Sequence, residues 1–298
     1  MRVTNGMIIN TTLSGLYNNM NQLNKTYAQM TTGKKIQTVS DDPIIAGRAL
    51  KLTTSVLENV QYQSNTKEAL SWMETTEGAL KNMNDILTTI RTECLKGADG
   101  TLKNEDKEKV KTQVEGLWEQ LQGEANVTYA GRYVFSGYKT DKPLMKDGGV
   151  NPEVDGKISG QDIDYEIGVN STITVNTKGM DVTMNNMKTC MEGLITLDYD
   201  NLTESELHDK FNEALKQIDD IMSDIAEKTA DLGSKMDRLD YTKLRLSDQN
   251  VSYTNLLSQT ESVDIEEVYT NFNTQYATYQ SALQATSKII KNTLADYL

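Results

Sequence analysis

Proline is scarce along this chain, and this scarcity constrains the fold more than any other feature. The 298 residues include only three prolines, Pro43, Pro143 and Pro152. A proline removes a backbone donor and its ring clashes with the preceding turn, so it breaks the interior of a helix. No such break occurs between residues 44 and 142 or after residue 152. The sequence therefore permits very long helices over most of its length.

The N-terminal segment places its apolar residues at the spacing of a coiled coil. Within residues 9–30 these residues are separated alternately by four and three positions, which is the heptad pattern of helices that pack along a narrow seam. They are Ile9, Leu13, Leu16, Met20, Leu23, Tyr27 and Met30. Most other positions are Asn, Thr, Ser, Gln or Gly, and the only charge is Lys25. Because Asn, Thr, Ser and Gly are weak helix formers, the segment specifies a face more strongly than a stable helix.

The C-terminal segment has the same character. Its apolar stripe comprises Phe272, Tyr276, Tyr279, Leu283 and Ile290, and no charge occurs from Asn271 to Ser287. Two helices that each carry one apolar stripe pair most simply with each other. We therefore predict that residues 1–32 and 262–298 form an antiparallel coiled coil, and that the two stripes are the assembly interface.

Long helices are also predicted in the middle of the chain. Periodic apolar residues indicate helices at about 44–95 and 104–130, and Asp42 stands before Pro43 as a helix start. A later helix, to about residue 258, begins at a capping box formed by Thr203 and Glu206. We expect these helices to form a central bundle from residues 33–131 and 183–261.

Residues 132–182 break the helical period. Ile163, Tyr165, Ile167 and Val169 alternate with polar residues, which is the period of a β-strand. We predict a small β-rich outer domain at this place. The expected fold is therefore mainly α, a long antiparallel helical bundle or coiled coil formed by the N- and C-terminal segments, with a small β-rich domain inserted in the middle.

The charge and hydropathy of the chain disfavour several partners. Its net charge is −13, whereas nucleic acids and anionic membrane surfaces attract clustered Lys and Arg. No run of 18 or more apolar residues occurs, so no membrane-spanning helix is predicted. The first ten residues, MRVTNGMIIN, lack the apolar core of a cleaved signal peptide. We therefore expect no nucleic acid and no membrane among the partners, and no cleaved signal.

No set of residues in the sequence predicts an active site. His208 is the only histidine, which excludes a His-based triad or a multi-His metal site. Cys94 and Cys190 lie on different predicted helices and are expected to be free thiols. The stretch GRYVFSGYKT lacks the spacing of a phosphate-binding loop, and DIDYE (162–166) lacks the glycine turn of a calcium loop. We expect no catalytic residue, no cofactor and no metal, and hence no enzyme.

Several stretches resemble the flagellin superfamily of bacterial flagellar axial proteins. They are SDDPIIAGRALKLTTSVLENVQYQSN (40–65), WMETTEGALKNMNDIL (72–87) and DIEEVYTNFNTQYATYQSALQATSKIIKNTLADYL (264–298). Within that superfamily, GRYVFSGYKTDKPL (131–144) and the ending LADYL look like the hook-associated junction proteins rather than the flagellins. The resemblance covers nearly the whole chain, but residues 145–182 show no such match.

The resemblance implies a structural protein of the bacterial flagellum. Such a protein forms a ring of identical subunits between an adjacent hook-associated junction protein and the first flagellin. The resemblance also implies export through the flagellar type III apparatus to an extracellular location, after binding to a cytoplasmic export chaperone. The few prolines and the absence of a required disulfide agree with a chain that is threaded unfolded.

The weak helix propensity of both ends suggests how they assemble. We expect both termini to be disordered in the free monomer and to fold on joining the filament. Their uncharged faces suit burial against neighbouring subunits, where unpaired charges would be costly. Three alternatives remain, namely flagellin itself, a helical pore-forming toxin, which should show a concentrated apolar hairpin, and an enzyme.

Overall fold

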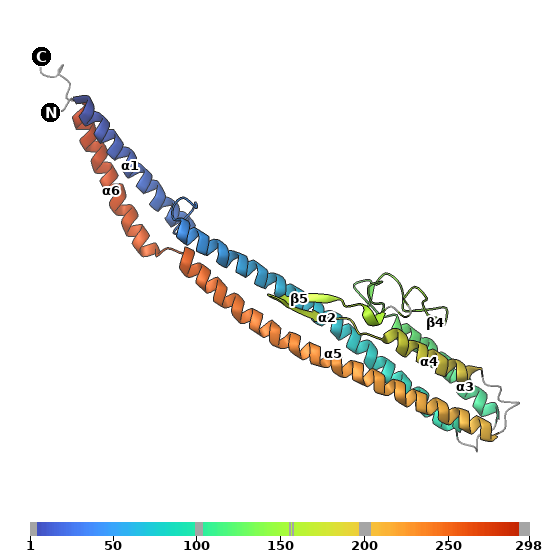
Figure 1. The fold of residues 1–298 in the computed structure, drawn as a ribbon. Coiled ribbons are helices and arrows are strands. Elements are labelled where there is room, and N and C mark those ends of the chain that lie inside the picture. The colour runs from blue at the N-terminus through green and yellow to red at the C-terminus, as the bar shows by residue number, and fades with distance from the viewer. Residues whose placement is uncertain (1–4, 99–103, 155, 157, 197–203, 292–298) are drawn as a thin grey trace, which may run out of the picture. The chain divides into compact units, whose positions relative to one another are not determined.

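A computed structural model describes residues 5–98, 104–154, 156, 158–196 and 204–291 (Figure 1). The chain divides into two compact units, which we call unit 1 (residues 1–58 and 249–298) and unit 2 (residues 59–248). Two long helices, α2 (Pro43–Ala98) and α5 (Glu204–Glu261), contribute to both units. Long helices with a few small antiparallel sheets make up the described chain, so the predicted mainly α fold is confirmed.

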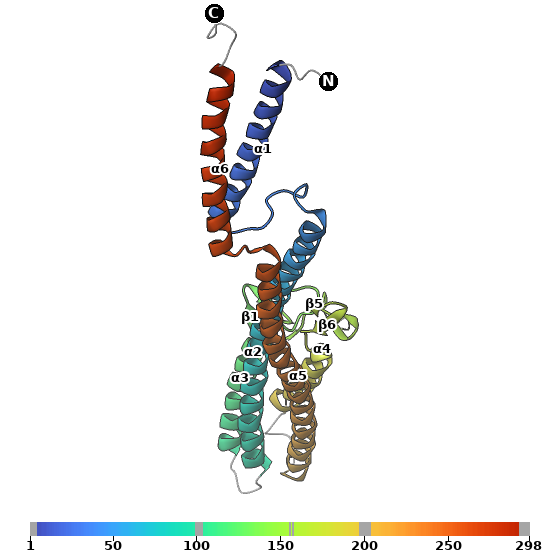
Figure 2. The same ribbon diagram turned by 90° about the vertical axis from the view of Figure 1, so that its left-hand side faces the viewer.

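In unit 1 the two terminal helices lie side by side and run antiparallel. Figures 1 and 2 show α1 (Asn5–Thr32) beside α6 (Ile265–Lys291) in both views. The helix α1 ends just before Gly33, whose φ of 68° is the left-handed conformation that favours glycine at a helix end. Beyond this point the backbone amide of Lys35 donates to the carbonyl of Glu261 at 2.6 Å, and that of Val263 donates to Gly33 at 3.0 Å. These bonds tie the two connecting segments together.

Aspartates cap two of the helices of unit 1. The carboxylate of Asp42 accepts hydrogen bonds from the amides of Ile44 and Ile45, each at 3.0 Å. Asp264 accepts in the same way from Glu266 at 3.0 Å, at the start of α6. A carboxylate at this place satisfies backbone amides that have no partner within the helix. The predicted start at Asp42 is confirmed, whereas Thr203 of the predicted capping box lies outside the described residues.

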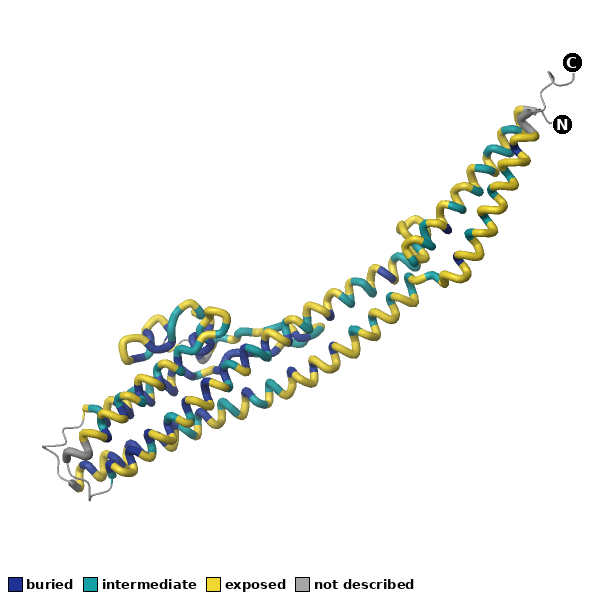
Figure 3. Tube along the Cα trace, turned by 180° about the vertical axis from the view of Figure 1, so that it is seen from behind, coloured by how far each residue is buried: buried dark blue, intermediate teal, exposed yellow. Residues whose placement is uncertain are grey.

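Unit 2 contains the larger core. It packs its parts of α2 and α5 with α3 (Asn104–Ala125) and α4 (Met180–Ile195), and Figure 3 shows buried positions concentrated along these helices. The largest fully buried side chains are Phe135, Phe211, Met73, Leu80, Met83, Leu87, Ile90, Leu121, Leu144, Ile158, Ile167 and Met180. Helix α3 ends earlier than predicted, at Ala125, because the following residues pair as strands.

The inserted segment forms three antiparallel hairpins and a short 3₁₀ turn, Ile158–Gly160. The strands are β1 (Thr128–Tyr129), β2 (Arg132–Tyr133), β3 (Met145–Lys146), β4 (Gly149–Val150), β5 (Asp164–Gly168) and β6 (Ser171–Thr174). The first two hairpins turn at Ala130–Gly131 and Asp147–Gly148, where all four residues have positive φ. Such type I′ turns match the twist of a hairpin. The strand predicted from the alternating pattern of residues 163–169 is confirmed by β5.

The hairpins share the core of the helices. Leu144, Ile158 and Ile167 are at most 1% exposed and belong to the same apolar cluster as the buried residues of α2, α3, α4 and α5. Strands this short expose too much backbone and too little apolar surface to form a core of their own. The division into residues 1–32 with 262–298, 33–131 with 183–261, and 132–182 stays a prediction.

Both cysteines lie in the core of unit 2 as free thiols, as predicted. Burial raises the pKa of Cys94 to about 12 and that of Cys190 to about 11, because the apolar surroundings disfavour the thiolate. Neither thiol is therefore a nucleophile at neutral pH.

Candidate assembly interface

The contact between α1 and α6 follows a heptad seam that is only partly apolar. Its members are buried or half-buried and are spaced alternately by three and four residues. On α1 they are Ile9, Thr12, Leu16, Asn19, Leu23, Thr26 and Met30, and on α6 they are Val268, Phe272, Gln275, Tyr279, Ala282 and Thr286. Polar side chains thus alternate with apolar ones along α1. A seam with polar side chains at these positions removes less apolar area from water than a fully apolar heptad seam would.

One polar pair crosses the seam directly. The hydroxyl of Thr26, which is 8% exposed, donates to the side-chain oxygen of Gln275 at 2.7 Å. The hydroxyl of the buried Thr286 has no partner among the described residues. A paired buried polar group adds little net stability, and an unpaired one lowers it. The seam therefore fixes the register of the two helices more than it stabilises them.

The predicted interface residues occupy two neighbouring stripes. Those on the seam or beside it are half-buried, namely Ile9, Leu13, Leu16, Leu23, Met30, Phe272 and Tyr279. The exposed ones are Met20, Tyr27, Tyr276 and Leu283, which are 37%, 56%, 46% and 41% exposed. Ile290 belongs to α6, but its side chain lies outside the described part of the chain. The seam thus shares every second position with the predicted stripe of α1.

An outward stripe remains on each helix. Met20 and Tyr27 are seven residues apart on α1, and Tyr269, Tyr276 and Leu283 continue the same spacing on α6. The rings of Tyr27 and Phe272 lie 6.1 Å apart, and Phe272 stacks on Tyr276 at 6.1 Å, so aromatic contacts join the stripes across the pair. Each terminal helix therefore carries a partly apolar seam toward its partner and a second, apolar stripe toward solvent.

A groove of about 740 Å³ lies beside the connection between α1 and α2. Its apolar lining includes Ile36, Val39, Pro43 and Leu50, and Val39 and Leu50 are each 70% exposed. The neighbouring loop is ordered by Asp41, which accepts hydrogen bonds from the amides of Gln37 and Thr38. These bonds lower the pKa of Asp41 to about 2. The groove was not predictable from the sequence, because no periodic pattern covers residues 33–42.

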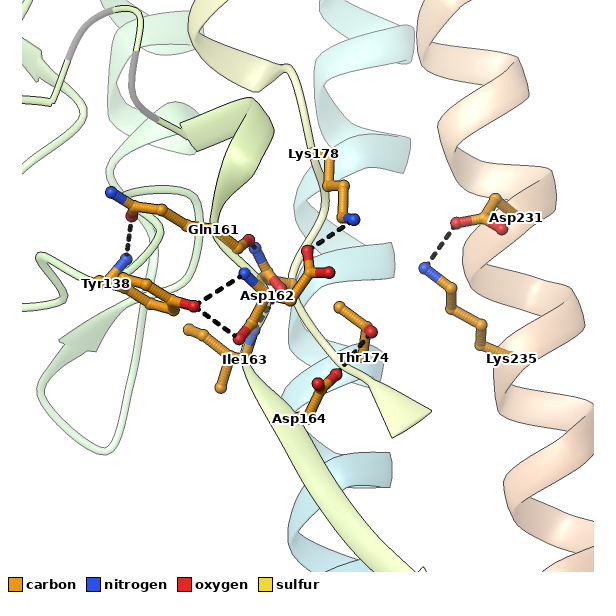
Figure 4. Close-up of polar contacts among 10 residues, drawn as sticks. Tyr138, Gln161, Asp162, Ile163, Asp164, Thr174, Lys178, Asp231 and Lys235 are labelled. Atoms are coloured by element: carbon orange, nitrogen blue, oxygen red, sulfur yellow. Dashed lines mark hydrogen bonds and ion pairs between the residues drawn. The ribbon is translucent and has the colours of Figure 1, made fainter. Parts of the chain in front are cut away.

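The acidic stretch at residues 162–166 is bound internally in unit 2 (Figure 4). Lys178 donates to Asp162 at 2.5 Å, and Thr174 donates to Asp164 at 2.6 Å. The hydrogen bond to Asp162 raises the pKa of Lys178. The hydroxyl of Tyr138 meets the backbone of Asp162 as well, donating to its carbonyl at 3.1 Å. These contacts fix the position of the hairpin β5–β6, so the acidic stretch has a structural role.

Two other kinds of site, a metal centre and a membrane-spanning helix, are absent from the described residues. No group of three or more His, Cys, Asp or Glu side chains is placed to hold a metal ion. None of the described helices combines the length and hydropathy needed to cross a bilayer. The surfaces of α1 and α6, with their exposed apolar side chains at heptad spacing, are the candidate site.

The sequence matches two family models that together cover most of the chain. Residues 3–140 match the N-terminal helical region of bacterial flagellin, and residues 215–298 match the C-terminal helical region. The chain therefore belongs to the flagellin superfamily.

Its relatives and structural neighbours include hook-associated proteins. The chain is 26% identical to flagellar hook-associated protein 3 of Escherichia coli strain K12, over 97% of this chain and 95% of that protein. It is 32% identical to flagellar hook-associated protein 3 of Salmonella typhimurium, although the matched segments are 47% of this chain and 45% of that protein. The fold is shared with a solved flagellar hook-associated protein of Vibrio parahaemolyticus, with a TM-score of 0.63 and 19% identity, over 74% of this chain and all of that one.

Proposed function

We propose that this chain is a structural axial protein of the bacterial flagellum. It acts as a junction adaptor that joins the hook, through a neighbouring hook-associated protein, to the flagellin filament. Identical subunits form a ring by coiled-coil assembly of their terminal helices. Its relatives named hook-associated protein 3 support this assignment.

One observation carries the proposal, namely the outward apolar stripes of α1 and α6. Tyr27 on α1 and Tyr276 on α6 are about half exposed, and each lies seven residues from another exposed apolar residue of its own helix. Residues spaced by seven lie on one face, so each stripe is the seam that a further helix would fill. Lys25 is the only charge in residues 3–33, and residues 271–287 have none. A neighbouring subunit could therefore cover these faces without desolvating charges.

The composition of the seam supports folding on assembly. Thr12, Asn19 and Thr26 take seam positions that Leu or Ile would fill in a stable coiled coil. We therefore infer that the terminal helices are mobile in the free monomer and become fixed when neighbours cover the outward stripes. In the same proposal an export chaperone covers these stripes before secretion without a cleaved signal, and the mature ring lies outside the cell.

Complementation of a strain that lacks its junction protein tests the function. The wild-type chain should retain secreted flagellin as filament, whereas deletion of residues 279–298 should abolish incorporation and leave unit 2 folded. The truncated protein must appear in the medium, which shows that export is intact. A truncated protein that builds normal junctions would refute the role of α6.

A matched pair of variants tests the stripes themselves. Met20→Ser with Leu283→Ser removes two exposed apolar side chains from the outward stripes, and should lower incorporation. Leu95→Ser with Val182→Ser removes two exposed apolar side chains from unit 2, where they are 47% and 55% exposed, and should leave incorporation near the wild-type level. Equal effects of the two pairs would contradict the proposal.

Flagellin itself is the second candidate, because the family models are those of flagellin. The two candidates differ in a simple observation. Purified protein that grows long filaments by itself would favour flagellin over a junction adaptor.

A further inference from the structure

A polar pocket of about 540 Å³ lies in unit 2, where the tip of hairpin β5–β6 meets α5. Its lining consists of Ser171 on the hairpin and Ser234, Asp237, Arg238, Tyr241, Thr242 and Arg245 on α5. Arg238 and Arg245 are seven residues apart, so they lie on one face of the helix. Tyr241 stands between them and is 75% exposed. The proposed terminal assembly helices do not use this pocket.

Among the described residues, no ion pair joins either arginine of the pocket to an acidic side chain. Within the part of the chain that the structure describes, neither guanidinium makes a hydrogen bond or an ion pair. One turn before Arg238 on the same helix, Lys235 is paired with Asp231 at 2.7 Å (Figure 4). Nearer the start of α5, Lys228 is paired with Asp224. Arginine has a planar fork of donors that binds carboxylates in two places at once. Two such forks give the pocket two cationic groups against one carboxylate, that of Asp237. In a chain of net charge −13, the pocket can therefore attract an anionic group.

The hairpin holds the pocket in shape. Its base is fixed by the contacts of Asp162 and Asp164 with Lys178 and Thr174 (Figure 4). A side chain added at Gly168 would begin 3.6 Å from a terminal nitrogen of Arg245, so the hairpin lies directly against this guanidinium. The amide of Asn65 on α2 also donates to the carbonyl of Glu166 at 2.8 Å. The wall beside Arg245 is therefore anchored to α2 and held at its base by contacts within and beside the hairpin.

We propose that this pocket binds carboxylate side chains on the surface of a second copy of the chain. The inference rests on the proposed ring, in which identical subunits must meet through two different surfaces. A second copy offers an excess of carboxylates, since the chain has 43 acidic and 30 basic residues. Tyr and Arg are also the residues enriched at the energetic centres of protein interfaces. The pocket is thus an electrostatic contact between the central bundles, separate from the terminal coiled coil.

Charge reversal in the complementation assay tests the inference. Arg238→Glu with Arg245→Glu should lower incorporation by about tenfold or more, because two close charge pairs become repulsive. Lys67→Glu with Lys81→Glu makes the same change of net charge on an exposed part of α2 and should have little effect. Circular dichroism and thermal unfolding of the purified variants check the fold. If the Glu variant misfolds, Arg238→Gln with Arg245→Gln decides the question.

The outcomes separate this inference from the proposed function. Failure of the wild-type chain to restore junctions would overturn the function and the inference together. A wild-type chain that restores junctions, with an arginine variant that is folded and incorporates equally well, would overturn only the inference. The inference would also be overturned if the wild-type chain binds polygalacturonate and a folded arginine variant loses this binding but incorporates normally. An acidic polysaccharide would then be the occupant of the pocket.

Discussion

Replacing the polar seam residues of α1 should stabilise the pair of terminal helices. Thr12 and Asn19 are half-buried at seam positions, between Ile9, Leu16 and Leu23. Thr12→Leu with Asn19→Leu would complete an unbroken apolar seam over the first half of α1. Because we expect the wild-type pair to be marginal, the effect should be directly visible as slower local opening.

The structure sets the magnitude of this effect. Burying a Leu side chain fully contributes ~1.5–3 kcal/mol, and about half of that applies at half-buried positions. The better helix propensity of Leu adds ~0.5 kcal/mol at each site. The two changes together should contribute ~2.5–4 kcal/mol, which corresponds to amide exchange roughly two to three orders of magnitude slower.

Amide hydrogen exchange of the free protein, followed by mass spectrometry over residues 9–30, measures the effect. Thr11→Leu with Asn18→Leu is the matched control, because both residues are exposed on the same helix. The control gains propensity alone, ~1 kcal/mol or about fivefold. Equal slowing in both variants, or none in either, would refute the assignment of Thr12 and Asn19 to the seam.

Two further predictions concern the core of unit 2. Leu87→Ala should lower the free energy of unfolding by ~3–5 kcal/mol, because Leu87 is 0% exposed. Leu95→Ala, at a 47% exposed position of the same helix, should cost far less, and urea unfolding followed by the fluorescence of the buried Trp72 and Trp118 compares the two. The pKa values of Cys94 and Cys190 are raised to about 12 and about 11, against an unfolded value of 9.0. Burial of the two protonated thiols therefore contributes fully to the free energy of unfolding below pH 9. Stability should fall as the pH rises toward 11, and Cys94→Ala with Cys190→Ala should show a smaller fall; an identical pH profile would contradict the burial of the thiols.

The helices were predictable because their signals are local. The gap between Pro43 and Pro143 permitted α2, and Asp42 and Gly33 marked its start and the end of α1 through their own backbone chemistry. The strands β5 and β6 were predictable from alternation. The sharing of the core by the hairpins was not, because it depends on contacts between residues such as Ile167 and helices far away in the sequence.

The candidate site divides in the same way. The sequence by itself determined that α1 has a single charge, Lys25, and that α6 has none from Asn271 to Ser287. It also determined the apolar heptads, since spacing alone places Leu16 and Leu23 on one face of α1. Only the tertiary structure decided which of two adjacent stripes lies inward. A heptad pattern defines its face to within one position, and the choice depends on the partner's side chains, as in the bond between Thr26 and Gln275. The same holds for the arginine pocket of α5, since one of its walls comes from a hairpin more than sixty residues earlier in the chain.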